Sequence, residues 1–96
     1  MKGLLIYFEV KDGMQAEFEK TMGNLASLVR EKDPTYSLYS ISKVKDSDTR
    51  YISVQRFDSY ESQMAHRDYD YVLEAMGPIM PCIASEPTMD FLEILD

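Results

Sequence analysis

The single histidine of the chain, His66, is the residue type best suited to proton transfer. Histidine titrates near neutral pH, so it is the natural group to take a proton from a phenolic hydroxyl. His66 opens the stretch HRDYDYVLEAM, residues 66–76. On a helix, Tyr69 and Asp70 would share its side, and Asp70 would hold one ring nitrogen and favour the charged form. The alternative is a partly exposed helical histidine with an acidic neighbour, and spacing alone favours that alternative.

Tyrosines are the second group that bears on function, with seven in 96 residues. Tyr39, Tyr51 and Tyr69 gathered near a pocket would stack on an aromatic ligand and donate hydrogen bonds to it. Tyrosine is also a good strand former, and this plainer interpretation is preferred for Tyr51 and Tyr69. For Tyr39 the two interpretations carry equal weight. The seven methionines would line an adaptable pocket or, more commonly, fill the core.

Several chemistries lack the residues that they need. One histidine and one cysteine cannot supply a Cys/His zinc set, and the loop KDSDT (45–49) lacks the glycine and distal glutamate of a calcium loop. The chain has no glycine-rich phosphate cradle and no G-x-S-x-G elbow. We therefore expect no metal and no cofactor, and we expect Cys82 to be buried and inert.

Charge and hydropathy limit the partners. The net charge is −7 and the ten basic residues are scattered among seventeen acidic ones, which argues against nucleic acids and anionic membrane surfaces. The apolar run near the N-terminus is too short to span a membrane, and no small-residue cleavage site follows it. Together with the single cysteine, these features predict a cytoplasmic protein without a membrane partner.

Hydrophobic periodicity predicts one domain over residues 1–96, with six elements. Strands are expected at 3–10, 35–44, 50–57 and 88–95, and helices at 14–31 and about 60–76. The second helix is expected to begin with Asp58 as its cap and Glu61 as the reciprocal partner. Its expected buried stripe comprises Ala65, Tyr69, Val72, Leu73 and Met76.

The order β-α-β-β-α-β predicts an α+β, ferredoxin-like fold, in which two helices pack on one face of an antiparallel sheet. The strands carry apolar side chains on both faces; Leu5 and Tyr7, for example, alternate with Leu4 and Ile6. The sheet face without helices would then expose a large apolar area, which is typical of an interface. We therefore expect a homodimer joined sheet to sheet with two-fold symmetry.

Three segments in order and spacing resemble the antibiotic biosynthesis monooxygenase superfamily of dimeric α+β barrels, which includes quinol monooxygenases. Val10–Phe18 matches a V-K-D-G-x-x-x-x-F entry into the first helix. DPTYSLY (33–39) resembles the E-P-G-C-L-x-Y that opens the second strand. YISVQRFDSYESQMAH (51–66) resembles a strand with E-x-W followed by x-S, x-E-A and a histidine.

The resemblance implies a cofactor-independent monooxygenase acting on a phenolic or hydroquinone substrate, whose enolate itself reduces dioxygen. It places the catalytic histidine at His66 and substrate-binding positions at Tyr39, Gln55 and Phe57; Tyr69, near His66, completes the expected set. Gln55 replaces a family glutamate and cannot act as a base, and Phe57 replaces a tryptophan and lacks its N–H. Haem degradation, known in another branch, is not expected, because it uses a strand-one asparagine and a tryptophan that this chain lacks.

Two other functions remain open. A non-catalytic dimeric barrel would bind a small apolar molecule or a partner protein, and the replacements at Gln55 and Phe57 favour it. An isomerase or lyase acting on a small carbonyl compound would use the same barrel for proton shuttling, because a fold does not fix the reaction.

Overall fold

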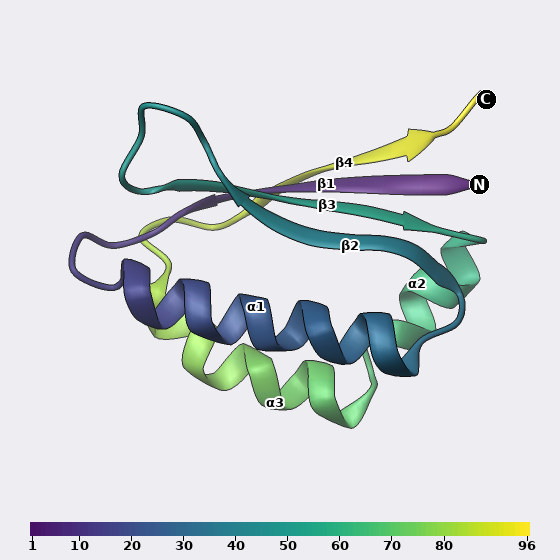
Figure 1. Cartoon of the computed structure of the whole chain (residues 1–96), viewed down its shortest axis with the longest axis horizontal. Helices are drawn as coiled ribbons and strands as arrows, with labels where there is room; N and C mark the ends of the chain where they lie inside the picture. The colour runs from purple at the N-terminus through teal and green to yellow at the C-terminus, as the bar shows by residue number, and fades with distance from the viewer.

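The computed structural model describes residues 1–96 and confirms the predicted α+β, ferredoxin-like architecture, with the second predicted helix divided in two (Figure 1). The elements in chain order are β1 (Lys2–Glu9), α1 (Gln15–Lys32), β2 (Tyr36–Lys43), β3 (Arg50–Phe57), α2 (Tyr60–His66), α3 (Asp70–Ile79), a 3₁₀ turn η1 (Met80–Cys82) and β4 (Thr88–Glu93). None of the helices combines the length and the apolar character that crossing a membrane requires.

The four strands form one antiparallel sheet in the order β2-β3-β1-β4. β1 lies in the middle, so that Leu4 pairs with Gln55 on one side and with Phe91 on the other. Residues paired in this way point to the same face of the sheet. An irregularity in register between Tyr36 and Leu38 lets both Tyr36 and Tyr39 turn to the helical face.

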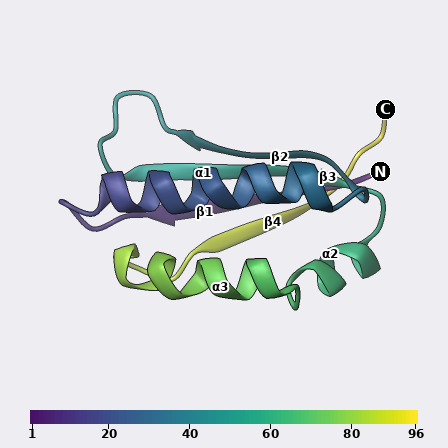
Figure 2. The ribbon, with the colours of Figure 1, turned by 60° about the horizontal axis from the view of Figure 1, so that its bottom comes forward.

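The helices cover one face of the sheet and leave the other uncovered (Figures 1 and 2). The core lies between these two layers, where Leu4 and Phe8 of β1 and Tyr51 and Phe57 of β3 meet the helices. Helix α1 contributes the stripe predicted from its sequence, because Phe18, Met22, Leu25 and Val29 are all buried. Cys82 is also buried, as expected, and its thiol donates to the carbonyl oxygen of Pro78.

The end of α1 fixes the position of Asp33, a residue of the site described below. The backbone N–H of Asp33 donates to the carbonyl oxygen of Val29 at 2.9 Å, while its own backbone is extended. Pro34 follows and cannot continue the helix. The Asp33 side chain is thereby directed into the protein, and only 3% of its surface is exposed.

The prediction of one helix over 60–76 is wrong in its continuity and in its buried face. The helix stops at His66 and restarts at Asp70, with Tyr69 extended between them. This interruption shifts the phase of the helical wheel, so Tyr69, Leu73 and Met76 of the predicted stripe are exposed. Ala65 is exposed as well, and Val72 alone of that stripe is buried. The buried residues of α2 are Gln63 and His66.

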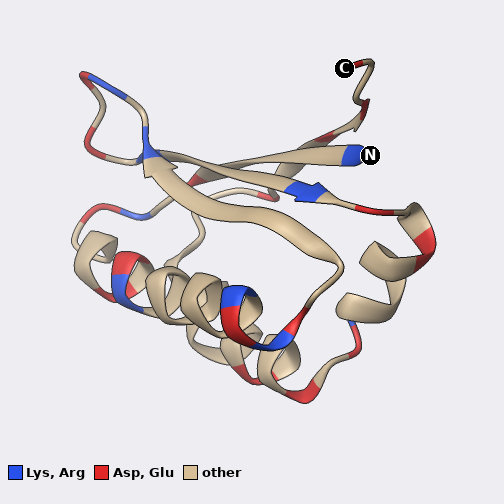
Figure 3. Ribbon diagram, turned by 45° about the vertical axis from the view of Figure 1, so that its right-hand side comes forward, with Lys and Arg blue, Asp and Glu red and all other residues tan.

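The cap of α2 also differs from the prediction. Ser59, and not Asp58, is the N-cap, and its hydroxyl oxygen accepts a hydrogen bond from the N–H of Ser62. Acidic and basic residues are scattered over the helices, loops and strands, and the basic ones form no continuous stripe (Figure 3).

Candidate active site

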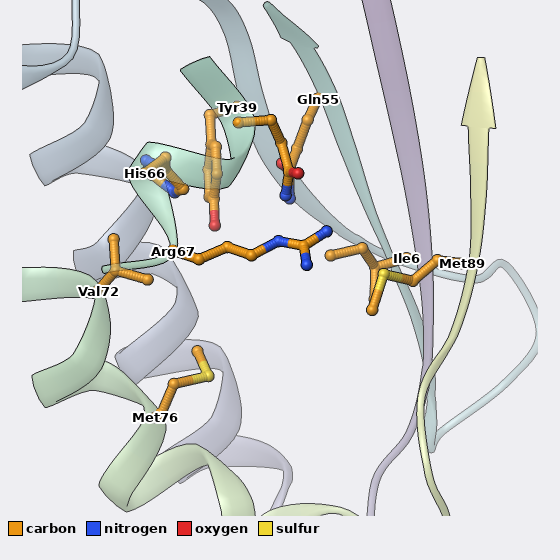
Figure 4. A pocket seen from close by; sticks show the side chains of 9 residues that line it. Ile6, Tyr39, Gln55, His66, Arg67, Val72, Met76 and Met89 are labelled. Carbon is orange, nitrogen blue, oxygen red and sulfur yellow. The ribbon is translucent and has the colours of Figure 1, made fainter. Parts of the chain in front are cut away.

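A cavity of about 320 Å³ lies between the sheet and the helices, next to the end of α2 (Figure 4). Its size falls at the lower end of the range for small-molecule sites. The walls come from β1, β2, β3 and β4 on one side and from α2 and α3 on the other. The residues that line it are Ile6, Tyr39, Gln55, Gln63, His66, Arg67, Val72, Met76 and Met89.

A second hollow of about 160 Å³ shares Ile6, Tyr39, Met76 and Met89 with this cavity. It extends toward α1, and ten of its eleven lining residues are hydrophobic. The combined space therefore has a polar end, next to His66 and the glutamines, and an apolar end between the sheet and the first and third helices.

His66 is buried at the polar end, with 3% of its surface exposed, so it is not the exposed helical residue that spacing alone favours. Its Nδ1 lies 3.2 Å from Oδ2 of Asp33. The other carboxylate oxygen, Oδ1, accepts hydrogen bonds from the backbone N–H of Thr35 at 3.0 Å and from its hydroxyl at 2.5 Å. The partner of His66 is thus Asp33, and the prediction that Asp70 holds the ring is wrong.

This arrangement fixes the roles of the two ring nitrogens. A carboxylate oxygen can only accept, so Nδ1 carries the proton and its N–H donates a hydrogen bond to Oδ2 of Asp33. The Nε2 atom is buried and has no hydrogen-bond partner. In neutral His66, Nε2 is therefore the free acceptor, and a histidine with this arrangement is able to take a proton from a bound molecule.

Burial and the Asp33 carboxylate shift the pKa of His66 in opposite directions. Burial lowers the pKa of His66 below its usual value, while the hydrogen bond and the negative charge of Asp33 raise it. Burial is the larger effect, so the imidazole is neutral at pH 7. Because the unfolded chain keeps a pKa of about 6.5, it takes up the proton first as the pH falls, and the stability that neutral His66 contributes is lost on acidification through the folded pKa.

Four tyrosine rings surround His66. Ring centroids lie 4.6 Å away for Tyr36, 5.6 Å for Tyr39, 5.8 Å for Tyr69 and 6.4 Å for Tyr71. Burial raises the pKa of both Tyr36 and Tyr39, so their hydroxyls stay protonated as hydrogen-bond donors. The predicted cluster of tyrosines exists, but Tyr51 is not in it; its hydroxyl donates to Glu19 at 2.5 Å, at the other end of the sheet.

The structure brings three of the five predicted site residues to the cavity. Tyr39, Gln55 and His66 line it, and the hydroxyl of Tyr39 points into the open space (Figure 4). The amide nitrogen of Gln55 donates to the hydroxyl oxygen of Ser53 at 3.1 Å. Phe57 is fully buried behind the cavity, where it packs on Tyr36. Tyr69 lies on the outer side of His66 and lines a shallow surface hollow instead.

Three residues of the site are absent from the sequence prediction. Asp33 precedes Pro34, and this pair of residues indicates only that the first helix ends there. Nothing in the local sequence indicates that Asp33 contacts His66. Gln63 is buried in α2, on a side of the helix that the predicted stripe does not include. Arg67 directly follows His66 in the sequence, but no periodic pattern indicates that its side chain lines the cavity. No group of three or more potential metal ligands is present around these residues.

Comparisons with known proteins agree with the fold. The family model described as antibiotic biosynthesis monooxygenase matches residues 1–77. A solved structure of a Caulobacter crescentus protein that carries the same family name has a TM-score of 0.94 at 24% identity, covering 99% of this chain and 90% of that one. A Nitrosomonas europaea protein of that name has a TM-score of 0.92 at 18% identity, covering 100% of both chains.

A variant of SnoaB, a cofactor-independent oxygenase from Streptomyces nogalater, has a TM-score of 0.83 at 14% identity. The similarity covers 99% of this chain and 93% of that one. The search of curated proteins finds no match. Structural similarity at these identities shows a common fold, while the family match rests on the sequence of residues 1–77.

Proposed function

Because the chain belongs to the antibiotic biosynthesis monooxygenase family, we propose that it is a cytoplasmic monooxygenase that oxidises a quinol or polyphenol with dioxygen and no cofactor. The observation that carries the proposal is the Asp33–His66 pair beside a mostly apolar cavity. An aromatic ring fits between Ile6, Val72 and the methionines, and the imidazole supplies a base at the edge of that space. SnoaB is described as cofactor-independent, and we extend this property to the present chain as part of the proposal.

In the proposed reaction, Nε2 of His66 takes the proton of one substrate hydroxyl. The resulting phenolate is electron-rich and transfers electrons to dioxygen. One oxygen atom forms a bond to a ring carbon and the other leaves as water, so that a hydroquinone and dioxygen give a hydroxyquinone and water. The Asp33 carboxylate stabilises the imidazolium that forms after the first proton transfer.

The remaining predicted residues have binding roles in this proposal. The protonated hydroxyl of Tyr39 donates to the second oxygen of the substrate, and the amide of Gln55 offers a donor and an acceptor beside it. Phe57 acts indirectly, because its ring supports Tyr36, which in turn packs on His66. Tyr69 closes the outer side of the imidazole and limits access of water to it.

We expect the purified protein to consume oxygen with at least one member of a panel of benzo- and naphthohydroquinones, faster than the same compound in buffer. The measurement is dissolved oxygen, with product identification by mass spectrometry in ¹⁸O₂. Incorporation of one labelled atom per product distinguishes oxygenation from oxidation to the simple quinone. A panel with no turnover above buffer, or turnover that continues without oxygen, would contradict the proposal.

We further propose that two copies join through the uncovered sheet face. The residues that point to this face include Leu5 and Tyr7 of β1, Ile52 and Val54 of β3, and the exposed Leu38 and Leu92 of the edge strands. The first four are only partly buried within one chain. Packing this apolar face against a second copy removes it from water. In a two-fold dimer the same surface of each subunit forms the interface.

Val54→Asp is expected to convert the dimer to a monomer, because it places a charge at the centre of the proposed interface. Light scattering coupled to size-exclusion chromatography measures the mass of the particle at micromolar concentration. Asn24→Asp adds the same charge on an exposed position of α1 and is expected to leave the dimer intact. A wild-type protein with the mass of a single chain would exclude the proposed dimer.

A non-catalytic ligand-binding protein is the second candidate, and one observation favours it. Gln55 has no ionisable group and is held by Ser53, while Phe57 does not reach the cavity. Gln55 therefore supplies no second acid–base group where the family has a glutamate, and Phe57 supplies no N–H donor where the family has a tryptophan. Binding of an aromatic ligand that is unaffected by replacement of His66, without turnover, would support this candidate.

A further inference from the structure

We propose that the ligand of this cavity carries an acidic group beside its hydroxylated ring, and that Arg67 binds that group. The inference rests on the proposed function only for the reacting hydroxyl at His66; the binding of the acidic group is independent of turnover. Arg67 would then determine which aromatic molecules enter the site, while His66 and Asp33 act on the hydroxyl.

Arg67 is placed at the opening of the cavity by the end of α2. Its side chain extends from the helix across the space toward Ile6 and Met89 of the sheet (Figure 4). It also lines an outer groove with Tyr60, Met64 and Phe91, so its guanidinium lies between the groove and the cavity. The guanidinium carbon is 5.9 Å from the ring centroid of Phe91, which supports the extended side chain from the outer side.

The guanidinium has no acidic partner within the chain. The ion pairs in the structure join Lys2 to Glu93, Lys43 to Glu19 and His66 to Asp33, and none involves Arg67. Its side chain makes no hydrogen bond either. Arg67 lines the cavity, so its unpaired guanidinium is available to a ligand that enters there.

The surroundings of Arg67 fit an anion and not a cation. No Asp or Glu is among the residues that line the cavity. The amides of Gln55 and Gln63 lie at the same polar end and offer further N–H donors. A carboxylate accepts two parallel hydrogen bonds from a guanidinium, which adds geometric selectivity to the attraction between charges.

The apolar end of the space defines the rest of the ligand. Beyond Ile6, Met76 and Met89 the adjoining hollow is almost entirely hydrophobic and extends toward Leu25 and Phe8. A fused aromatic ring system that enters from the side of Arg67 would place its apolar part there. The chemical class that satisfies all three regions is a hydroxylated aromatic carboxylic acid, with the hydroxyl at His66, the carboxylate at Arg67 and a second ring in the hollow.

The test compares binding of 1-hydroxy-2-naphthoate with that of 1-naphthol, which lacks the carboxylate, by isothermal titration calorimetry at two salt concentrations. We expect the wild type to bind the acid about ten-fold or more tightly, as for other charge-assisted pairs. In Arg67→Gln the two dissociation constants are expected to agree within about three-fold, whereas Arg67→Lys should retain part of the preference. Arg50→Gln, which removes an exposed arginine outside the cavity, serves as the matched control.

Higher salt should weaken binding of the acid and leave that of 1-naphthol unchanged, because the guanidinium is exposed at the cavity opening. Equal affinity for the two compounds in the wild type, a preference that persists in Arg67→Gln, or no binding of the acid would each overturn the inference. Preferential binding of the acid by a protein that oxidises no hydroquinone would support the role of Arg67 and contradict the proposed oxygenase activity. The two proposals are therefore separable.

Discussion

Replacing His66 with glutamine is expected to lower kcat for quinol oxidation by about 10²- to 10⁴-fold, the usual contribution of a positioned general base. Glutamine still offers an N–H to Oδ2 of Asp33, so the buried carboxylate keeps a partner and the fold is preserved. The amide cannot take the substrate proton at neutral pH. KM is expected to change much less than kcat, because the apolar walls that bind the ring are untouched.

The pH dependence of the wild type adds a second readout. The base must be neutral, and burial lowers the pKa of His66, so kcat/KM is expected to fall only below about pH 6.5, on an acidic limb that His66→Gln lacks. His66→Ala removes the imidazole and leaves space, so added imidazole should restore part of the turnover. Turnover by His66→Gln within about three-fold of wild type would assign His66 a purely structural role.

Replacing Asp33 with asparagine is expected to lower kcat by a similar factor while leaving the protein folded. The Oδ1 atom of asparagine still accepts from Thr35, but its amide group donates to Nδ1 of His66. The imidazole proton then moves to Nε2, which becomes a donor and can no longer act as the base. The same exchange in a Ser-His-Asp triad reduces kcat about 10⁴-fold for this reason.

Because the chain has one histidine, an NMR titration of its imidazole signal reports on this pair without ambiguity. The Asp33 carboxylate raises the pKa of His66 against the larger effect of burial, so the pKa in Asp33→Asn should be lower still than in the wild type. Asp48→Asn, in an exposed loop, is the matched control for loss of one carboxylate. An unchanged titration and unchanged kcat in Asp33→Asn would show that the pair does not act as a unit.

Most of the fold follows from local pattern. The strands at 3–10 and 50–57 and the helix at 14–31 are bounded by turn residues and have clear periods, and the structure places them within one residue of the predicted ends. The error lies at residues 67–69, where no proline or glycine marks the break between α2 and α3. A three-residue interruption changes which side of a helix is buried, so a single missed break alters the predicted burial of several side chains.

The order of the strands along the chain, the family and the candidate base could be predicted from the sequence, because they depend on residue types and on local spacing. The residues that surround this base could not be predicted in the same way, because they come from segments that are far apart in the sequence. Asp33 and His66 are 33 positions apart and meet because the end of α1 and the end of α2 lie over the same end of the sheet. Burial of His66, the free Nε2 and the unpaired Arg67 are likewise results of packing. Contacts between distant segments follow from the burial of apolar faces, and no local pattern encodes which polar side chains that burial brings together.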